Sequence, residues 1–212
     1  MAEKVLIVGA GIAGLCCALA LGRSGREVTI LERDAPPPAG GADVAFRDWK
    51  RSGVGHLRQS HAFLARLRNI LQADHPGLLA DLAAEGVRDL GFEGMLSELQ
   101  RDHYRARPGD AELTIITSRR TTLELVMRRY VETLPDIVVR PGVFVRGLIT
   151  ERRGDAPLRV TGVRADEGGR AVEIRADVVV DASGKGGILV DQLREAGAVI
   201  PEFNESAGIL YF

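Results

Sequence analysis

The sequence predicts an α/β fold in which a parallel sheet is joined to an antiparallel meander. Three observations lead to this prediction. A continuous apolar run, Val5 to Val8, leads directly into a glycine-rich turn, Gly9 to Gly14, and then into a helix. A second apolar run, Val28 to Leu31, follows that helix, and a third, Val178 to Val180, lies far along the chain. Such uninterrupted apolar runs are typical of parallel strands that are buried on both faces.

The glycine-rich turn has the spacing of a dinucleotide-binding motif. Gly9 allows a sharp turn off the strand, Gly11 leaves space for a pyrophosphate, and Gly14 lets the helix pack close to the sheet. Ile12 and Ala13 belong to the first turn of the helix, whose free N–H groups bind phosphate. These five residues are therefore predicted to contact a dinucleotide, and the alternative is a glycine-rich turn without a ligand.

An acidic residue closes the second strand. Glu32 follows the glycines by about 20 residues, the spacing at which a carboxylate accepts hydrogen bonds from both hydroxyls of an adenosine ribose. An acid at this place disfavours the 2′-phosphate of NADP. We therefore predict a Rossmann-like domain with Glu32 at the ribose.

Composition limits the remaining choices. The chain has 212 residues, enough for one sizeable α/β domain or for one domain with part of another. Its net charge of −1 gives no electrostatic reason to expect a nucleic acid or an anionic membrane as partner. No apolar run is long enough to span a bilayer, and the first strand leaves no room for a signal peptide, so we expect a cytoplasmic protein.

The adjacent Cys16 and Cys17 are expected to pack in the first helix, and the histidines lack metal-ligand spacing.

The other elements follow from periodicity and from turn residues. Gly25 is expected to end the first helix, and the prolines and glycines of residues 33–41 predict a loop. Apolar residues at helical spacing predict helices from near Ala62 and from Pro76. Further helices are expected at residues 121–134, where Glu124 and Arg128 can form an i,i+4 pair, and at 188–195.

Several short β-like segments are expected in the second half of the chain. Residues 96–104 and 111–117 predict two strands that begin a second sheet, joined by a turn at Pro108 to Asp110. Alternating patterns predict an antiparallel meander of residues 137–140, 143–149, 158–165 and 171–175. The chain ends with Leu210 to Phe212, which resemble the interior of a strand.

The motifs together resemble the FAD-dependent monooxygenases of the para-hydroxybenzoate hydroxylase type. That superfamily also contains flavin-dependent halogenases and isoprenoid-chain reductases. The likeness extends over nearly the whole chain. Four segments carry it: GAGIAG at 9–14 with Glu32-Arg33, SGVGHLRQSHAFLARL at 52–67, SRRTTLELVMRR at 118–129, and VVVDASGKGG at 178–187.

The resemblance implies additional cofactor contacts. In the family, an arginine of the second segment reaches the flavin, which implies Arg58 here, and an arginine that leads the helix of the third segment contacts FAD. The doubled arginine leaves Arg119 and Arg120 open for this second role, and Arg119 is favoured because it directly follows Ser118. Arg33 follows the ribose acid, and Asp181 and Gly184 are expected at the cofactor's phosphates.

The resemblance also implies a domain division. Residues 1–88 and 118–200 would form a discontinuous, incomplete FAD-binding domain, and residues 89–117 and 201–212 part of a substrate-binding domain. The family's third motif, a strand followed by Gly-Asp, is absent from this sequence. Ser183-Gly184 stands where the monooxygenases carry Asp-Gly, and no WxWxIP motif surrounds Trp49, which counts against a halogenase.

The implied activity is that of an FAD-dependent monooxygenase with NADPH or NADH as transient reductant. In the family, a C4a-hydroperoxyflavin passes one oxygen to a small aromatic or polycyclic substrate. The flavin carries this chemistry, so no catalytic side chains are expected. The alternatives are a reductase or dehydrogenase, a halogenase-like enzyme, and a truncated or split chain that is inactive without a C-terminal complementing chain.

Overall fold

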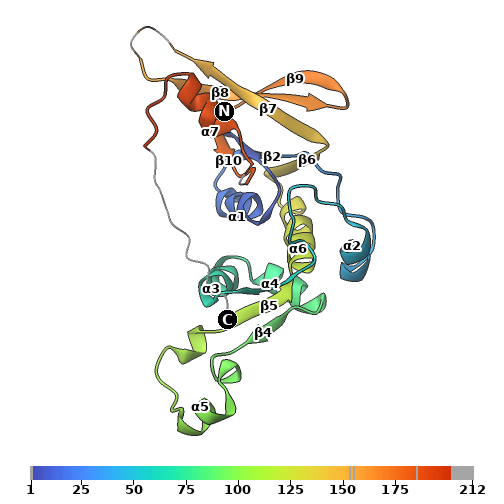
Figure 1. Ribbon diagram of the computed structural model, residues 1–212, viewed down its shortest axis with the longest axis vertical. Coiled ribbons are helices and arrows are strands. Elements are labelled where there is room, and N and C mark those ends of the chain that lie inside the picture. Colours follow the sequence, from blue (N-terminus) through green and yellow to red (C-terminus); the bar gives the residue numbers. More distant parts are fainter. Residues whose placement is uncertain (1, 153, 155, 185, 202–212) are drawn as a thin grey trace.

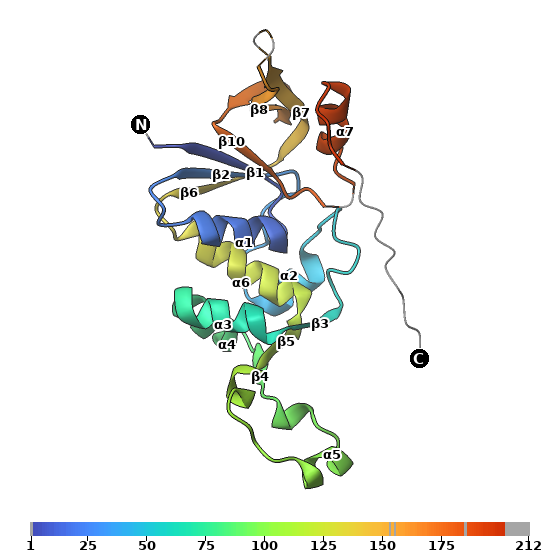
Figure 2. The same cartoon turned by 90° about the vertical axis from the view of Figure 1, so that its left-hand side faces the viewer.

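The computed structural model describes residues 2–152, 154, 156–184 and 186–201. Its centre is a parallel sheet of β1 (Lys4–Val8), β2 (Glu27–Glu32), β6 (Ile137–Pro141) and β10 (Val178–Asp181), in the order β10-β1-β2-β6. An antiparallel sheet lies on one face of this sheet, and α1 (Ile12–Leu21) and α6 (Arg120–Glu132) lie on the other (Figures 1 and 2). This arrangement confirms the predicted fold class.

The central strands β1 and β2 of the parallel sheet are buried on both faces, as their apolar runs predict, whereas Val178 of β10, expected to be buried in the same way, is exposed because β10 lies at the edge of this sheet. Side chains of successive residues alternate between the faces of a strand. Val5 and Ile7 of β1 therefore pack in the core with the helices, while Leu6 and Val8 pack in a second core with the antiparallel sheet. The register pairs Val8 with both Leu31 and Asp181, so the carboxyl ends of β1, β2 and β10 meet at one edge of the sheet.

The antiparallel sheet is the expected meander, with one strand fewer. It consists of β7 (Val143–Glu151), β8 (Arg159–Glu167) and β9 (Arg170–Arg175), and α7 (Leu189–Glu195) packs on β7. Residues 137–140, expected in the meander, instead form β6 beside β2 in the parallel sheet. The physical reason is packing, because Ile137 is buried in the core with the helices, and Gly142 (φ +73°) then redirects the chain.

A third, small sheet lies below the helices. Its strands β3 (Ser60–Phe63), β5 (Ile115–Arg119) and β4 (Arg88–Leu90) are antiparallel in the order β3-β5-β4, next to α3 (Ala65–Asp74) and α4 (Pro76–Ala84). The helix predicted from Ala62 was wrong at its start. Residues 60–63 pair with β5 instead, and Phe63 packs against the main core, so tertiary pairing overrides the helical spacing.

The strand predicted at residues 96–104 is wrong, because this segment contains the short helix α5 (Glu98–His103). Ser97 and Gln100 form a reciprocal capping box at its start, a signature that the sequence contains as Ser-x-x-Gln. The neighbouring residues form 3₁₀ turns, η1 (Glu93–Met95) and η2 (Asp110–Glu112), so the strand expected at 111–117 begins only at Ile115. In Figures 1 and 2 this segment forms a lobe that extends away from the central sheet.

Two further elements differ from expectation. The first helix ends at Leu21 with Gly22 as its cap, and Gly25 (φ +74°) lies in the following turn. A short helix that the sequence pattern did not predict, α2 (Ala42–Asp48), follows the expected loop. The division into an FAD-binding part and a substrate-binding part stays a prediction, and the strand expected at Leu210 to Phe212 lies outside the described residues.

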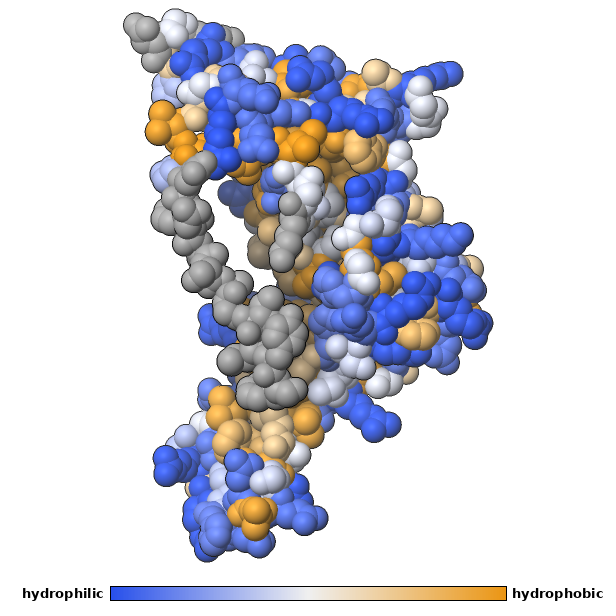
Figure 3. Space-filling model, viewed as in Figure 1, coloured by the Kyte–Doolittle hydropathy of each residue, from blue (hydrophilic) through white to orange (hydrophobic). Residues whose placement is uncertain are grey.

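The surface is mixed in character. Figure 3 shows hydrophilic side chains over most of the viewed face, with apolar surface over the antiparallel sheet and at the top of the lower lobe. In the described part of the chain, no helix has the length and hydropathy needed to cross a membrane.

Replacing Gly14 by alanine should destabilise the protein. A Cβ atom at this position would lie 1.9 Å from the carbonyl oxygen of Gly9, so α1 would have to move away from the sheet. We expect the free energy of unfolding to fall by about 3 kcal/mol, the upper end for overpacking, measured by urea denaturation.

The matched control is Gly77→Ala in α4, where a Cβ atom would meet Tyr130 at an ordinary 3.5 Å. Its free energy of unfolding should stay level or rise by up to about 1 kcal/mol, because alanine is the better helix former. Equal stability of the two variants would contradict the tight contact between α1 and the glycine turn.

A hydrogen bond in the lower lobe predicts a tyrosine with unusual titration. The Tyr104 hydroxyl donates to Asp110 Oδ2 at 2.7 Å, and this bond raises the pKa of Tyr104 to about 12. Asp110→Asn removes the charged acceptor, so the pKa should fall towards the ordinary value of about 10. Absorbance of ionised tyrosine against pH, with circular dichroism to check the fold, measures the shift. Superimposable curves for wild type and variant would refute the bond.

Candidate cofactor-binding site

A cavity of about 530 Å³ opens at the carboxyl edge of the parallel sheet. Five separate segments line it: the glycine turn, the end of β2 with residues 33 and 34, the loop at 51–54, residues 143–145 of β7, and residues 182–184 and 186–189 after β10. Arg120 at the start of α6 completes the lining. Ligands of open α/β sheets bind at this edge.

The three glycines of the turn have different surroundings, so a side chain is missing at each for a different reason. Gly9 has φ +104°, and a Cβ atom there would lie 2.6 Å from the carbonyl oxygen of Ala182 after β10. Gly14 contacts the backbone of the turn itself, as described above. Gly11 has an ordinary φ of −79°, lines the cavity, and a Cβ atom there would meet no protein atom within 4 Å. Its missing side chain therefore leaves cavity space next to the start of α1.

Glu32 lines the cavity, but its carboxylate already has protein partners. Oε2 accepts hydrogen bonds from the backbone N–H of Ala10 at 2.8 Å and from Arg51 at 3.0 Å, and Oε1 accepts from the N–H of Asp34 at 2.9 Å. Each carboxylate oxygen accepts about two hydrogen bonds. Oε1 therefore keeps capacity for one ribose hydroxyl, where the sequence led us to expect two.

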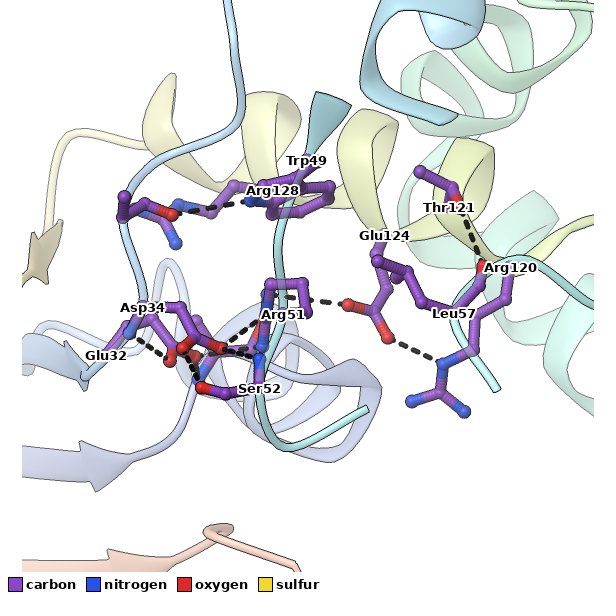
Figure 4. A network of polar contacts seen from close by, with 12 residues as sticks. Glu32, Asp34, Trp49, Arg51, Ser52, Leu57, Arg120, Thr121, Glu124 and Arg128 are labelled. Carbon is purple, nitrogen blue, oxygen red and sulfur yellow. Dashed lines mark hydrogen bonds and ion pairs between the residues drawn. The ribbon is translucent and has the colours of Figure 1, made fainter. Parts of the chain in front are cut away.

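Arg51 organises the site, and sequence reasoning missed it. Its side chain is 4% exposed and forms ion pairs with Glu32 at 3.0 Å, Asp34 at 3.4 Å and Glu124 at 3.4 Å. It also donates to the carbonyl oxygen of Ala10 at 3.3 Å and lies over the ring of Trp49. Figure 4 shows these acidic side chains around the Arg51 guanidinium. An isolated arginine in a loop has no periodic pattern that would have marked it as buried.

Arg33, predicted at the site, also lines the cavity. Its guanidinium lies over Gly53, where a Cβ atom would be 2.5 Å from Arg33 Nη2. The absence of a side chain at Gly53 therefore allows Arg33 to lie along the loop at 51–54.

Arg58 is placed away from the cavity. Its guanidinium donates to the carbonyl oxygens of Phe46 at 2.9 Å and Arg47 at 3.0 Å, at the end of α2. A cation is favourable there because the last carbonyls of a helix have no partner within it. In this structure Arg58 therefore holds α2, and its contact with a flavin stays a prediction.

Of the two arginines that the sequence left open, Arg120 lines the cavity and Arg119 does not. Arg119 is the last residue of β5 and turns towards α2, where it pairs with Asp43 at 2.6 Å and lies over the ring of Phe46. The hydrogen bond from Arg119 lowers the pKa of the Asp43 carboxyl. Arg120 begins α6 and points the other way, because neighbouring residues at a strand end face opposite sides.

The turn after β10 is held by Asp181. Its Oδ1 accepts hydrogen bonds from the backbone N–H of Ser183 at 3.0 Å and from the Ser183 hydroxyl at 2.5 Å. Gly184, with φ +87°, lines the cavity, whereas Asp181 does not. The acid therefore shapes the turn that brings Gly184 to the cavity, and its contact with phosphates stays a prediction.

The ion pairs along α6 differ from the expected pairing of Glu124 with Arg128. Glu124 pairs with Arg120 at 2.7 Å, and Arg128 pairs with Glu132 at 2.6 Å. The order Glu then Arg is the better one in an isolated helix, but Glu124 and Arg128 are both buried here and tertiary contacts decide.

The residues around the cavity fit a dinucleotide. The start of α1 offers free N–H groups beside the space at Gly11, one oxygen of Glu32 can accept a ribose hydroxyl, and Arg33 and Arg120 bring positive charge. The strand, glycine turn, helix and acid together define a dinucleotide-binding α/β domain. Residues 4–205 match the family described as "FAD binding domain", and the chain belongs to this family.

Two relatives match most of this chain. The chain is 32% identical over 197 residues to "Protein Rv3254" of Mycobacterium tuberculosis, covering 87% of this chain and 38% of that protein. It is 30% identical over 204 residues to L-aspartate oxidase of Caulobacter vibrioides, covering 86% of this chain and 37% of that protein. The chain therefore spans well under half the length of either relative.

Two solved structures share the fold. The flavin-dependent halogenase CmlS matches with a TM-score of 0.60 and 22% identity, over 93% of this chain and 31% of that chain. The p-nitrophenol 4-monooxygenase PnpA of Pseudomonas putida matches with a TM-score of 0.55 and 19% identity, over 85% of this chain and 40% of that chain. At these identities the likeness shows the architecture alone.

Replacing Arg51 by methionine should destabilise the protein strongly. The change leaves three carboxylates without their shared cation in a buried place. We expect a loss of about 3–5 kcal/mol in the free energy of unfolding, because a buried charge without its partner is costly. The control is Arg26→Gln, which breaks an exposed pair with Glu3 and should cost less than about 1 kcal/mol. Comparable losses in both variants by chemical denaturation would contradict the organising role of Arg51.

Proposed function

We propose that this chain supplies the FAD-binding part of an FAD-dependent oxidoreductase. The observation that carries the proposal is the cavity at the carboxyl edge of the sheet, where the space at Gly11 lies beside the start of α1. Membership in the FAD binding domain family supports FAD as the occupant. The acid Glu32 at the ribose end disfavours a 2′-phosphate, which argues against NADP as a resident cofactor.

The residues of the chain would bind and orient the cofactor. The N–H groups at the start of α1 and the glycine turn would hold the diphosphate, and Glu32 Oε1 would accept one ribose hydroxyl. Val143 and Val145 of β7 give that side of the cavity an apolar lining. When bound, the flavin supplies the redox chemistry, and the protein provides its position and its electrostatic surroundings.

The first candidate reaction is monooxygenation, with NADPH or NADH as a transient reductant and a small aromatic or polycyclic molecule as substrate. The sequence motifs support it by their resemblance to flavin monooxygenases. The shared fold with a p-nitrophenol 4-monooxygenase is compatible with it. The reductant, the substrate and a position in the cytoplasm are part of this proposal.

The second candidate is oxidation of an amino acid. It rests on the 30% identity to an L-aspartate oxidase across most of this chain. The two candidates differ in the electron donor, which is a nicotinamide for the first and the substrate itself for the second.

The greater length of the relatives suggests that an additional polypeptide segment contributes to the enzyme. Because this chain spans 38% and 37% of the two relatives, we propose that a C-terminal complementing portion completes the enzyme. We propose neither a nucleic acid nor a membrane as a partner of this chain.

Replacing Gly11 by valine tests the binding site. The valine side chain would enter the cavity next to the start of α1 and should abolish FAD binding, while the free energy of unfolding should fall by only about 1 kcal/mol, because valine is a poorer N-cap than glycine but meets no protein atom. The measurement is a titration of the purified chain with FAD, followed by flavin fluorescence and absorbance.

The control for this titration is Gly91→Val, because Gly91 lies away from the cavity and a Cβ atom there would meet only Thr114 at 3.9 Å. It should bind FAD like the wild type. Undiminished FAD binding by Gly11→Val would refute the proposed site. A wild-type chain that binds FAD only with a complementing C-terminal portion would support the split arrangement.

The reaction class is tested by anaerobic reduction of the FAD-loaded protein. Bleaching of the flavin by NADPH or NADH would support the monooxygenase. Bleaching by L-aspartate or another L-amino acid, with no effect of the nicotinamides, would support the oxidase and overturn the first candidate.

A further inference from the structure

Glu124 is a buried acid that lies behind the cavity. Its side chain is fully buried, and it is not among the residues that line the cavity. Oε1 accepts a hydrogen bond from Arg120 Nε at 2.7 Å, and Oε2 lies 3.4 Å from Arg51 Nη1. Figure 4 shows its carboxylate between these two arginines. Glu124 thus contacts both arginines, and both line the cavity.

The burial of Glu124 needs an explanation beyond helix stability. A buried carboxylate is costly unless it is paired and hydrogen-bonded. On the same helix, Arg128 and Glu132 repeat the i,i+4 pairing of Arg120 and Glu124, but the Glu132 side chain is 41% exposed. Pairing along α6 therefore does not require a buried glutamate. The position of Glu124 is distinguished by its contact with a second arginine from another segment.

The two arginines that it holds have different surroundings. Arg51 is committed to protein, with Glu32, Asp34 and the carbonyl oxygen of Ala10 as further partners. Arg120 has Glu124 and His56 as partners and keeps N–H donors beyond these bonds, with its side chain 17% exposed. Arg51 therefore acts as an anchor for Glu32, and Arg120 is the cation that can meet a ligand.

The guanidinium groups of Arg51 and Arg120 line the same cavity and repel each other, and the Glu124 carboxylate between them offsets this repulsion. We infer that Glu124 is a positioning residue that holds Arg120 towards the diphosphate of the bound dinucleotide and holds Arg51 against the ribose acid Glu32. This inference rests on the proposed function, because it needs a dinucleotide in the cavity. It assigns a role in cofactor affinity to a side chain that does not touch the cofactor.

The test compares ligands that contain and lack the diphosphate. Glu124→Gln keeps the size of the side chain but removes its charge, so Arg120 should lose its alignment. We expect the dissociation constants of FAD and ADP to rise about tenfold, the size typical of residues that orient a ligand-binding group, while that of adenosine changes less. Calorimetric titration of the folded chain measures all three.

The matched control is Glu132→Gln, which removes the corresponding charge from the other pair on α6. It should leave the affinities for FAD, ADP and adenosine unchanged. A second variant, Arg120→Met, should weaken ADP binding in the same way. The double variant Glu124→Gln with Arg120→Met should then lose less ADP affinity than the two single losses combined, because one acts through the other.

The outcomes separate this inference from the proposed function. A wild-type chain that binds neither FAD nor ADP would overturn both. Wild-type binding with unchanged ADP affinity in Glu124→Gln, or equal losses for ADP and adenosine, would overturn the inference alone.

If Glu124→Gln does not fold, Glu124→Asp replaces it in the comparison. Aspartate keeps the charge but is too short to hold both arginines, so the loss for ADP should again exceed that for adenosine. Wild-type ADP affinity in Glu124→Asp would overturn the inference.

Discussion

A buried guanidinium surrounded by three carboxylates joins the parts of this structure that form the cavity. Arg51 contacts the end of β2 through Glu32 and Asp34, the glycine turn through Ala10, and α6 through Glu124. A charge in the interior is tolerated only with close partners of opposite charge. The positions of the loop at 51–54, the end of β2 and α6 relative to one another therefore depend on the same buried charge. The shape of the cavity depends on this interaction.

Backbone sterics impose the second constraint. Gly9 and Gly14 both occupy places where a Cβ atom would meet a carbonyl oxygen, from Ala182 and from Gly9 respectively. The turns after β1 and β10 therefore come close together, and α1 begins directly at the sheet edge. Gly11 is different, because it faces open space. Two glycines of the motif are thus required by close contacts within the protein, and the third leaves space in the cavity.

Charge in the cavity comes from residues that are far apart in the chain. Arg33 follows β2 and has room because Gly53 lacks a side chain, whereas Arg120 starts α6 and is held by the buried acid Glu124. Arg58 and Arg119, which the family resemblance favours as cofactor contacts, fix α2 by contacts with its last carbonyls, with Asp43 and with Phe46, and their contact with a cofactor stays a prediction. Arginines therefore fix a helix outside the cavity in two cases and line the cavity in two others.

The sequence by itself determined the nucleotide-binding core, because its signals are local. Apolar runs, glycine spacing and the acid at Glu32 are properties of neighbouring residues, and they predicted the parallel sheet and a dinucleotide-binding turn at its edge. FAD was implied only by the resemblance of four segments to a known family, and the match to the FAD binding domain family supports it. Tertiary structure alone decided the membership of β6 in that sheet, the strand at 60–63, and which of Arg119 and Arg120 lines the cavity. It also decided that Arg51 and Glu124 are buried partners. Their pairing joins residues 73 positions apart, the difference between 124 and 51, and no local pattern records a contact that exists only after the chain has folded.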